Sequence, residues 1–260
     1  MGIGRSLVRT ARDIATFGPA VLLRRILPRG ENGEVAISTF KGRLYLRPTD
    51  SDMEVLRQVF ALNEYDLSKF PQMRRINEEY LDCLTSGETP IIIDAGANIG
   101  AASLWFSKMF PDAIIYAVEP DRDNARICRQ NCQGHANIEI IEAGIGAEPG
   151  WVSLAKPDNA SWGIQTERRE DGEIPIITVP QICERTSATS RLFIVKIDIE
   201  GFERDLFSSE TEWVSEPEVI ILELHDWMLP GRRTSKQAQR VMFAQNREML
   251  ISGENLIFVR

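Results

Sequence analysis

The chain has 260 residues, which fits one large domain or one domain with an extension, and this length can bury enough surface to fold without disulfides or structural metals. Its net charge of −8 argues against nucleic acid as the main partner. Residues 1–30 have the opposite charge, since six arginines and one acid give them a net charge of +5. The remainder of the chain therefore carries a net charge of −13. No apolar stretch reaches the roughly 18 residues of a membrane-spanning helix, and residues 14–23 lack a secretory cleavage site, so we expect a cytoplasmic protein.

Residues 1–29 are expected to form one or two basic helices, interrupted near Gly18 and Pro19. Two interpretations are open for this segment. We favour a helical extension that packs on the main domain. The alternative is a peripheral membrane contact, or a surface for a protein partner, because basic amphipathic helices bind anionic lipid.

Further along, residues 35–47 alternate apolar and polar side chains around a short turn, which predicts a β-hairpin. Helical spacing of apolar residues follows over residues 50–62 and 71–84. We therefore expect residues 1–88 to form a basic helical and β-hairpin extension, and residues 89–260 to form the main domain.

From residue 91 onward, strands and helices alternate. Strands are expected at residues 91–94, 113–118, 138–141, 192–198 and 219–224, with helices at 99–109, 122–132, 202–207 and 235–245. This repetition predicts an α/β fold with a doubly wound, mostly parallel sheet. Residues 248–259 have the pattern of a closing antiparallel hairpin, which brings the sheet to seven strands.

An excursion interrupts this pattern at residues 144–190. Short strands are expected at residues 151–154 and 174–179, with a loop of turn-forming residues at 158–163 between them. Long excursions in compact α/β domains are often binding loops or lids. A binding loop and a simple insertion at the sheet edge both remain open.

The first strand ends at Asp94 and runs into a tight turn with Gly96 and Gly100, followed by an apolar helix. A strand, a glycine turn and a helix form the nucleotide-binding βα unit. We expect Gly96 to adopt a backbone angle that other residues resist, and Gly100 to let the helix pack close to the strand. Asn98 occupies the middle-glycine position of the dinucleotide fingerprint, which argues against a nicotinamide oxidoreductase.

A second acid, Glu119, ends the next strand, about 20 residues after the turn. In this architecture that position binds the hydroxyls of a ribose. Asp94 beside the turn would repel a pyrophosphate but attract an ammonium or a sulfonium group. The two acids and the glycine turn together predict a site for S-adenosylmethionine.

Further acids follow the later strands. The fourth strand ends in Lys196, Asp198 and Glu200, and the fifth ends in Glu223 and His225. Because ligand sites of open α/β sheets lie beyond the carboxyl ends of the strands, we expect these side chains to converge near Asp94 and Glu119. Several acids with a lysine and a histidine in one place should have shifted pKa values, which is typical of a proton-handling site.

At these residues the chain resembles the FkbM-type family of S-adenosylmethionine-dependent methyltransferases, a class I, Rossmann-like group. The resemblance covers about residues 91–225 and is carried by the runs IDAGANIG, VEP, KIDIEGFE and LELH. The segment with Asp52, Glu64, Tyr65 and Pro71 also fits. Known members mostly methylate hydroxyl groups of sugars, glycans and polyketide natural products, and their sheet has an antiparallel last strand.

The resemblance implies roles for individual residues. Asp94, Gly96, Asn98 and Gly100 would hold the methionine end of the cofactor, Glu119 the ribose, and Glu142 with Ala143 the adenine. The side chains that would face the methyl group and the substrate are Asp198, Glu200, Glu223 and His225.

Methyl transfer to a hydroxyl needs a group that removes the proton or a metal ion that lowers the hydroxyl's pKa. We predict His225 or Asp198 as the base, with Lys196 and Glu200 in the same catalytic group. A divalent cation held by Asp198, Glu223 and His225 is a less favoured alternative. His225 could also serve only as a structural hydrogen-bonding residue.

The resulting hypothesis is an O-methyltransferase for a small-molecule or glycan hydroxyl, with a non-catalytic S-adenosylmethionine-binding module as the alternative. Neither the acceptor nor the oligomeric state follows from the sequence. Of the four cysteines, Cys128 and Cys132 are spaced for one helix face but lack a second ligand pair for zinc. We expect them to be small apolar fillers in a reducing compartment.

Overall fold

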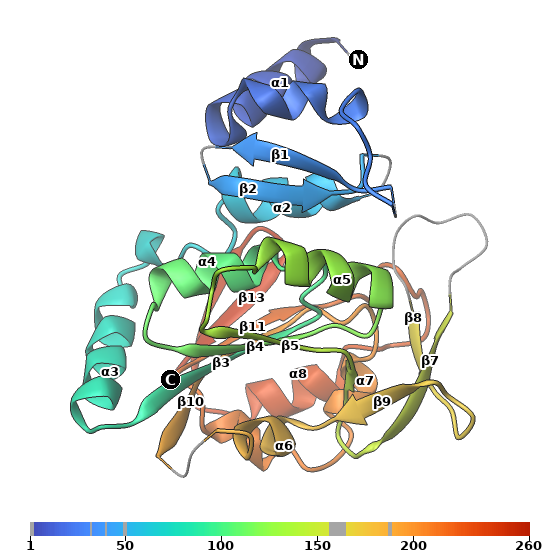
Figure 1. Cartoon of the computed structure of the whole chain (residues 1–260). Coiled ribbons are helices and arrows are strands. Elements are labelled where there is room, and N and C mark those ends of the chain that lie inside the picture. Colours follow the sequence, from blue (N-terminus) through green and yellow to red (C-terminus); the bar gives the residue numbers. More distant parts are fainter. Residues whose placement is uncertain (1–2, 32, 40, 49–50, 156–164, 187–188) are drawn as a thin grey trace.

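A seven-stranded sheet forms the centre of the computed structural model, which describes residues 3–31, 33–39, 41–48, 51–155, 165–186 and 189–260. The strand order is β12-β13-β11-β10-β3-β4-β5 (Figure 1). Its parallel strands are β3 (Thr89–Ala95), β4 (Ile114–Val118), β5 (Ile138–Ile141), β10 (Ser190–Ile197) and β11 (Val219–Glu223). The hairpin of β12 (Glu248–Ser252) and β13 (Asn255–Val259) closes the sheet, with β13 antiparallel to β11. The predicted mostly parallel sheet with an antiparallel last strand is confirmed.

Helices cover both faces of this sheet (Figure 1). On one face lie α4 (Ala101–Met109) and α5 (Arg122–Asn131), and on the other α6 (Val179–Cys183), α7 (Glu203–Leu206) and α8 (Lys236–Phe243). Alternate residues of β3 serve the two sides, since Ile92 belongs to one hydrophobic cluster and Ile91 and Ile93 to another. All three are fully buried, as a strand covered on both faces requires. None of the helices in the described part of the chain is long and apolar enough to cross a membrane.

The segment before the sheet has the predicted elements and one 3-10 turn, at residues 67–69, that was not predicted. They are α1 (Ile3–Phe17), the 3-10 helix η1 (Pro19–Arg25), the hairpin β1 (Val35–Thr39) and β2 (Gly42–Leu46), α2 (Asp52–Phe60), the 3-10 turn η2 (Leu67–Lys69) and α3 (Met73–Thr85). Gly18 separates α1 from η1 with a φ of 89°, which explains the break in the helix.

This N-terminal segment packs on the rest of the chain, as favoured from the sequence. The Phe17 ring is fully buried and meets the Phe60 ring of α2 edge to face, with 6.3 Å between centroids. Beside them, the Arg57 guanidinium pairs with the Asp13 carboxylate at 2.6 Å. Phe60 continues into the core against Trp105 of α4. Because one core runs through both parts, the division at residue 88 stays a prediction.

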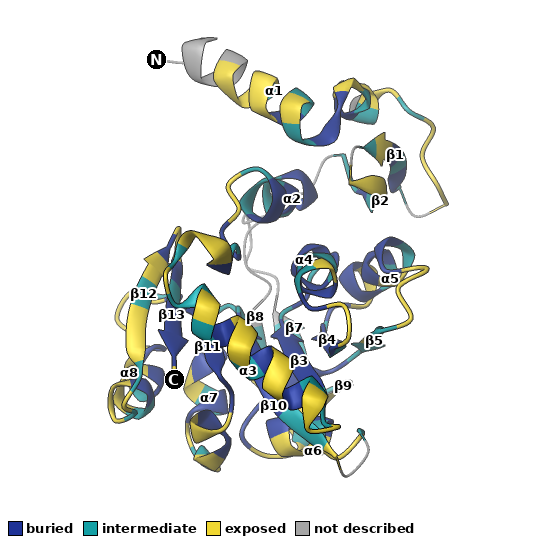
Figure 2. Cartoon of the chain, turned by 90° about the vertical axis from the view of Figure 1, so that its left-hand side faces the viewer, coloured by how far each residue is buried: buried dark blue, intermediate teal, exposed yellow. Residues whose placement is uncertain are grey.

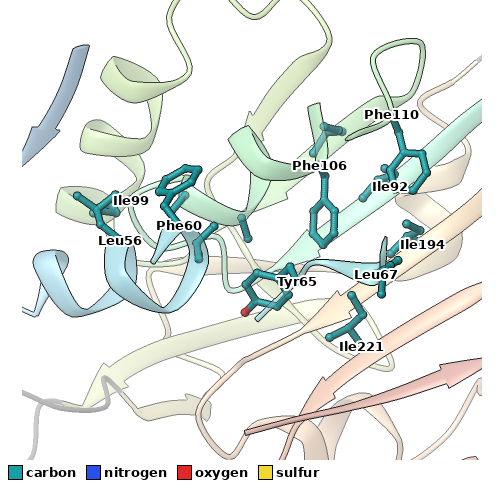
Figure 3. Packing of buried hydrophobic residues seen from close by; sticks show 14 of the residues in the cluster. Leu56, Phe60, Tyr65, Leu67, Ile92, Ile99, Phe106, Phe110, Ile194 and Ile221 are labelled. Carbon is teal, nitrogen blue, oxygen red and sulfur yellow. The ribbon is translucent and has the colours of Figure 1, made fainter. Parts of the chain in front are cut away.

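Figure 3 shows how that core connects the two parts. Leu56 and Phe60 of α2 lie in the same cluster as Phe106 of α4 and as Ile92 and Ile194 of the sheet. Each fully buried side chain of this size contributes about 1.5–3 kcal/mol to the free energy of unfolding. Residues that follow α2 are therefore held firmly next to the sheet.

The excursion forms a second, four-stranded sheet in the order β6-β9-β7-β8. Its strands are β6 (Gly144–Ile145), β7 (Gly150–Ala155), β8 (Gln165–Arg168) and β9 (Ile174–Ile177). Only β7 and β9 were predicted, because β6 has two residues and β8 is polar. The predicted strand over 174–179 was too long, since Thr178 begins α6 with a capping box to Gln181. The predicted loop at 158–163 lies outside the described residues.

Candidate functional site

The glycine turn between β3 and α4 lies directly against the end of β10. Gly96 has a φ of +78°, and a Cβ atom added there would lie 1.8 Å from the Asp198 carbonyl oxygen. The Asp198 amide also donates to the Ala95 carbonyl at 3.0 Å. The prediction for the backbone angle of Gly96 is confirmed, and only glycine leaves room for β10 at this point.

The prediction that Gly100 lets the helix pack close to the strand is wrong. Its φ is +84°, and an added Cβ would come within 2.8 Å of the Cys128 sulfur and 3.0 Å of the Cys132 sulfur. Gly100 therefore makes room for helix α5 rather than for the strand. Both cysteines are buried and their sulfurs lie 4.0 Å apart, which fits the predicted role of apolar fillers.

Asp94 and Lys196 form a buried ion pair under the turn. The Lys196 ammonium lies 3.0 Å from Asp94 Oδ1 and donates to the Gly96 carbonyl at 2.8 Å, while Ser103 Oγ donates to Asp94 Oδ2 at 2.6 Å. Burial alone lowers the pKa of Lys196, but Asp94, Tyr65 and Asp198 together outweigh it and raise the pKa well above its usual value. The sequence had grouped Lys196 with Asp198, which is the more distant partner at 3.4 Å.

Glu119 supports the turn from the neighbouring strand. Its carboxylate accepts a hydrogen bond from the Asn98 amide at 2.8 Å and another from the Asp121 amide at 2.9 Å. Burial raises the pKa of Glu119 to about 7, although these hydrogen bonds oppose the shift. Asp94, Gly96, Asn98, Gly100 and Glu119 are thus brought together, as predicted.

Glu142 and Ala143 follow β5, one strand further from the turn. The Glu142 carboxylate pairs with Arg129 at 2.9 Å and with Arg122 at 3.4 Å, both on α5. Ala143 is buried. The adenine role of these two residues stays a prediction.

His225 lies at the centre of a group of carboxylates at the ends of β10 and β11. Its Nδ1 is 2.8 Å from the fully buried Glu203 carboxylate, and its Nε2 is 3.5 Å from Asp198 Oδ1 and 3.5 Å from Glu223 Oε1. Burial alone lowers the pKa of His225, but the bonds to Asp198, Glu203 and Glu223 raise it to about 12. Burial likewise raises the pKa of Asp198, but Lys196 and His225 outweigh it and hold the value at about 2.

These side chains also have the arrangement of a cation site. One ligand atom each from Asp198, Glu223 and His225 lies within 4.8 Å of the others, and the described residues contain no second group of this kind. Histidines that bind metals usually donate the other ring nitrogen to a carboxylate, which is the position of Glu203 here. Carboxylate oxygens with one imidazole suit magnesium or manganese, so the residues fit such an ion.

Glu200, like Glu203, has one buried carboxylate oxygen without a hydrogen-bond partner, and it differs from Glu203 in its strained backbone. Glu200 Oε2 is buried without a hydrogen bond, and the residue has a φ of 49°, which side chains other than glycine rarely adopt. Burial and the nearby Asp198 carboxylate raise the pKa of Glu200 to about 8. A strained residue with a free carboxylate oxygen is typical of a functional position.

Glu64, from the loop after α2, also reaches this region. It is 8% exposed, accepts a hydrogen bond from Asn255 Nδ2 at 3.3 Å, and has a pKa raised to about 7 by burial and by Glu223. Neither Glu64 nor Glu203 was among the predicted site residues. Both lie in segments that carry the family resemblance, which is the signal that could have identified them.

Comparisons with known proteins identify the family of this chain. The profile of the methyltransferase FkbM domain matches residues 94–250. The chain is 24% identical over 156 residues to the 2-O-methyltransferase NoeI of Sinorhizobium fredii, and 21% identical over 174 residues to Methyltransferase 1 of Beauveria bassiana. These alignments cover 53% and 58% of this chain. They span 64% of each relative's length, which is less than two thirds.

Among solved structures, the precorrin-6y C5,15-methyltransferase from Geobacter metallireducens aligns with a TM-score of 0.37 at 12% identity. The alignment covers 70% of this chain and 86% of that chain. The overall match is loose, and the strand order of the sheet carries the fold assignment. Since the domain profile covers more than half of the sequence and includes the glycine turn and both acidic strand ends, the chain belongs to the FkbM methyltransferase family.

Proposed function

We propose that this protein is an S-adenosylmethionine-dependent O-methyltransferase that acts on a hydroxyl group of a sugar, a glycan or a glycosylated natural product. Membership of the family supports the reaction class. In this proposal Asp94, Gly96, Asn98 and Gly100 hold the methionine end of the cofactor and Glu119 binds the ribose hydroxyls. Glu142 and Ala143 border the adenine.

One observation carries the proposal: the glycine turn and the carboxylate group share one edge of the sheet. The Asp198 carbonyl oxygen lies where a Gly96 side chain would be, and Glu200 and His225 belong to the same strand ends. A methyl donor bound at the turn would therefore lie next to groups that can bind a hydroxyl and take its proton. Holding two reactants in line in this way contributes at best about 7–11 kcal/mol toward the barrier.

Glu200 is the proton acceptor that the geometry favours. Both ring nitrogens of His225 face carboxylates, and its raised pKa keeps a proton on the ring when no metal ion is bound. The lowered pKa of Asp198 makes that carboxylate a weak base. Glu200 Oε2 has no hydrogen-bond partner, and a pKa of about 8 makes its ionised form a stronger base than Asp198. The acceptor oxygen attacks the methyl carbon, the carbon–sulfur bond breaks, and the hydroxyl proton passes to Glu200.

Asp198, Glu223 and His225 would orient the hydroxyl in one of two ways. A protonated His225 could donate a hydrogen bond to the oxygen, or the three side chains could hold a divalent cation. When bound, such an ion lowers the pKa of a coordinated hydroxyl. We favour the cation, although the sequence analysis did not, because Glu203 fixes the ring with Nε2 toward the two carboxylates. A bound ion would replace the proton on Nε2, so the raised pKa of His225 describes the protein without the ion.

The proposed acceptor class has two supports. The relative from Sinorhizobium fredii is a 2-O-methyltransferase. In addition, Glu64, Glu200 and Glu223 place carboxylate oxygens in one region, and such oxygens accept hydrogen bonds from hydroxyl groups but repel phosphate or carboxylate acceptors.

Calorimetry with S-adenosylmethionine and with NAD tests the cofactor assignment. We expect binding of the first compound only, and binding of NAD alone would overturn the proposal. Transfer of a labelled methyl group to a panel of neutral and acidic sugars tests the reaction. A protein that binds the cofactor but labels no acceptor in the panel would support the alternative of a non-catalytic binding module.

A further inference from the structure

The helices α1 and η1 lie at one end of the molecule, beyond the β1–β2 hairpin and away from the large sheet (Figure 1). Figure 2 shows exposed residues along much of α1. Among the described residues, 11 large hydrophobic side chains are exposed, and four of them belong to this short segment. They are Val8 (64% exposed), Leu22 (46%), Leu23 (45%) and Ile26 (78%).

These exposed side chains do not hold the segment on the protein. Other residues of the segment do so. Phe17 and Val21 are almost fully buried and belong to the main hydrophobic cluster. The carboxylate of Asp13 is buried against Arg57. An exposed apolar set on an anchored segment is typical of an interaction surface.

Positive charge accompanies the apolar side chains. Arg12 and Arg29 have no ion-pair partner among the described residues. Most acids nearby are already neutralised, since Asp13 pairs with Arg57, Glu54 with Arg9 and Glu34 with Arg126. Glu31 is exposed without an ion pair among the described residues, so it offsets one of the two arginines in part. The remainder of the chain has a net charge of −13, so an anionic surface would attract this end of the molecule and repel the rest.

A groove between α1 and α2 adds room for part of an amphiphile. Its volume is about 440 Å³, and its walls include the apolar Val8 and Leu62 together with three arginines and two acids. Both acids are paired with arginines of the groove, Asp13 with Arg57 and Glu54 with Arg9, which leaves the Arg12 guanidinium for a ligand. Apolar walls beside guanidinium groups suit a molecule that has both a hydrocarbon part and an anionic headgroup.

We propose that the surface formed by α1 and η1, with Arg12, Arg29, Val8, Leu22, Leu23 and Ile26, binds an anionic phospholipid bilayer. The arginines contact the headgroups, and the apolar side chains enter the boundary between headgroups and acyl chains. Binding is peripheral and requires both the charge and the apolar contact.

Sedimentation of the full chain with lipid vesicles tests this proposal. We expect binding to vesicles of equal parts phosphatidylcholine and phosphatidylglycerol, release by added salt, and little binding to pure phosphatidylcholine. The double variant R12Q/R29Q should bind roughly 30-fold more weakly, because each arginine near such a surface contributes about a fivefold change in affinity. Ile26→Ser should also weaken binding by several-fold.

Matched variants elsewhere on the surface provide the controls. R232Q/R233Q removes the same charge from exposed arginines after β11, and Ile251→Ser removes a similarly exposed side chain from β12. These controls should bind like the wild type. Thermal unfolding of each variant verifies that the fold is intact.

Four outcomes would overturn the proposal. The first is no binding to anionic vesicles, and the second is equal binding to both kinds of vesicle. The third is an equal loss of binding in the control variants. The fourth is a stable dimer by light scattering that Ile26→Ser dissociates, which would assign this surface to a second copy of the chain.

Discussion

The candidate site has two halves whose charges are balanced differently: the cofactor half is the glycine turn with Asp94 and Glu119, and the carboxylate half is the group of acids around His225. At the glycine turn, Asp94 is paired with Lys196, and Glu119 accepts hydrogen bonds from two backbone amides. At the ends of β10 and β11, several carboxylates surround the single imidazole of His225, and Glu200 keeps an oxygen without a partner.

The acids of the turn are therefore balanced within the protein, whereas the acids around His225 outnumber the one imidazole. Both halves nevertheless keep a buried oxygen without a hydrogen-bond partner, Asn98 Oδ1 at the turn and Glu200 Oε2 in the carboxylate group, so each half offers atoms to a ligand. Buried polar atoms are nearly always satisfied in folded proteins, so an exception marks a place where a substrate or an ion binds. Each half can be tested separately by substitution, and the close approach of Gly96 to the Asp198 carbonyl oxygen joins the two.

Gly96→Ala should have the largest effect, because it breaks the contact between the halves. The new Cβ would lie 1.8 Å from the Asp198 carbonyl oxygen, so β10 or the turn must move. We expect the free energy of unfolding to fall by more than about 3 kcal/mol, with cofactor binding lost. Urea unfolding and calorimetry measure the two effects.

Gly87→Ala is the matched control for that variant. Gly87 also has a positive φ, of +75°, but an added Cβ would meet nothing within 4 Å. Its cost should be only the backbone strain of about 1–2 kcal/mol. Equal losses in the two variants would mean that strain, and not the contact with β10, explains the role of Gly96.

Glu200→Gln should abolish proton acceptance without disturbing the cofactor half. We expect kcat to fall by about 10²–10⁴-fold, the contribution typical of a general base, while the dissociation constant for S-adenosylmethionine changes little. Glu210→Gln is the control, since Glu210 has the same φ of 49° but is exposed. A Glu200 variant with more than half of the wild-type kcat would assign proton removal to another group.

Removal of divalent cations should affect the carboxylate half only. With EDTA we expect kcat to fall by about tenfold or more and to recover with Mn²⁺, since a bound ion lowers the pKa of the acceptor hydroxyl. Paramagnetic resonance should detect Mn²⁺ on the wild type but not on His225→Ala. Full activity in EDTA would instead support a protonated His225 as the group that orients the hydroxyl.

Patterns of apolar residues and glycines predicted most of the fold. The five parallel strands, the closing hairpin and most of the helices follow from the apolar pattern of the sequence, because a strand such as β3 is apolar on both sides only when helices cover both faces. Helix α6 was not predicted, since its start was assigned to the preceding strand. Strand β8 escaped prediction because its stability comes from pairing with β7, which a short polar sequence does not reveal.

The sequence predicted which residues form the candidate site but not which of them pair with one another. Position along the strands brought Asp94, Glu119, Asp198 and His225 to one edge, which follows from the topology of parallel sheets. Which partner each charge finds depends on distances of a few ångströms across strands. Lys196 therefore pairs more closely with Asp94 than with its chain neighbour Asp198.

The smallest expected effect concerns the cofactor half and its dependence on pH. Burial raises the pKa of Glu119 to about 7, so this group is ionised above that pH and protonated below it. An ionised carboxylate accepts hydrogen bonds from both ribose hydroxyls, whereas a protonated one does so less well. We expect affinity for S-adenosylmethionine to fall roughly 3- to 10-fold between pH 8 and pH 5.5.

Glu119→Gln separates this effect from titration of the ligand itself. The amide does not change charge, so the variant should bind more weakly than the wild type at pH 8, with the difference narrowing toward pH 5.5. Calorimetry of both proteins at the two pH values gives the comparison. A difference that stays constant with pH would mean that Glu119 is ionised throughout, and that its hydrogen bonds to the Asn98 and Asp121 amides outweigh its burial.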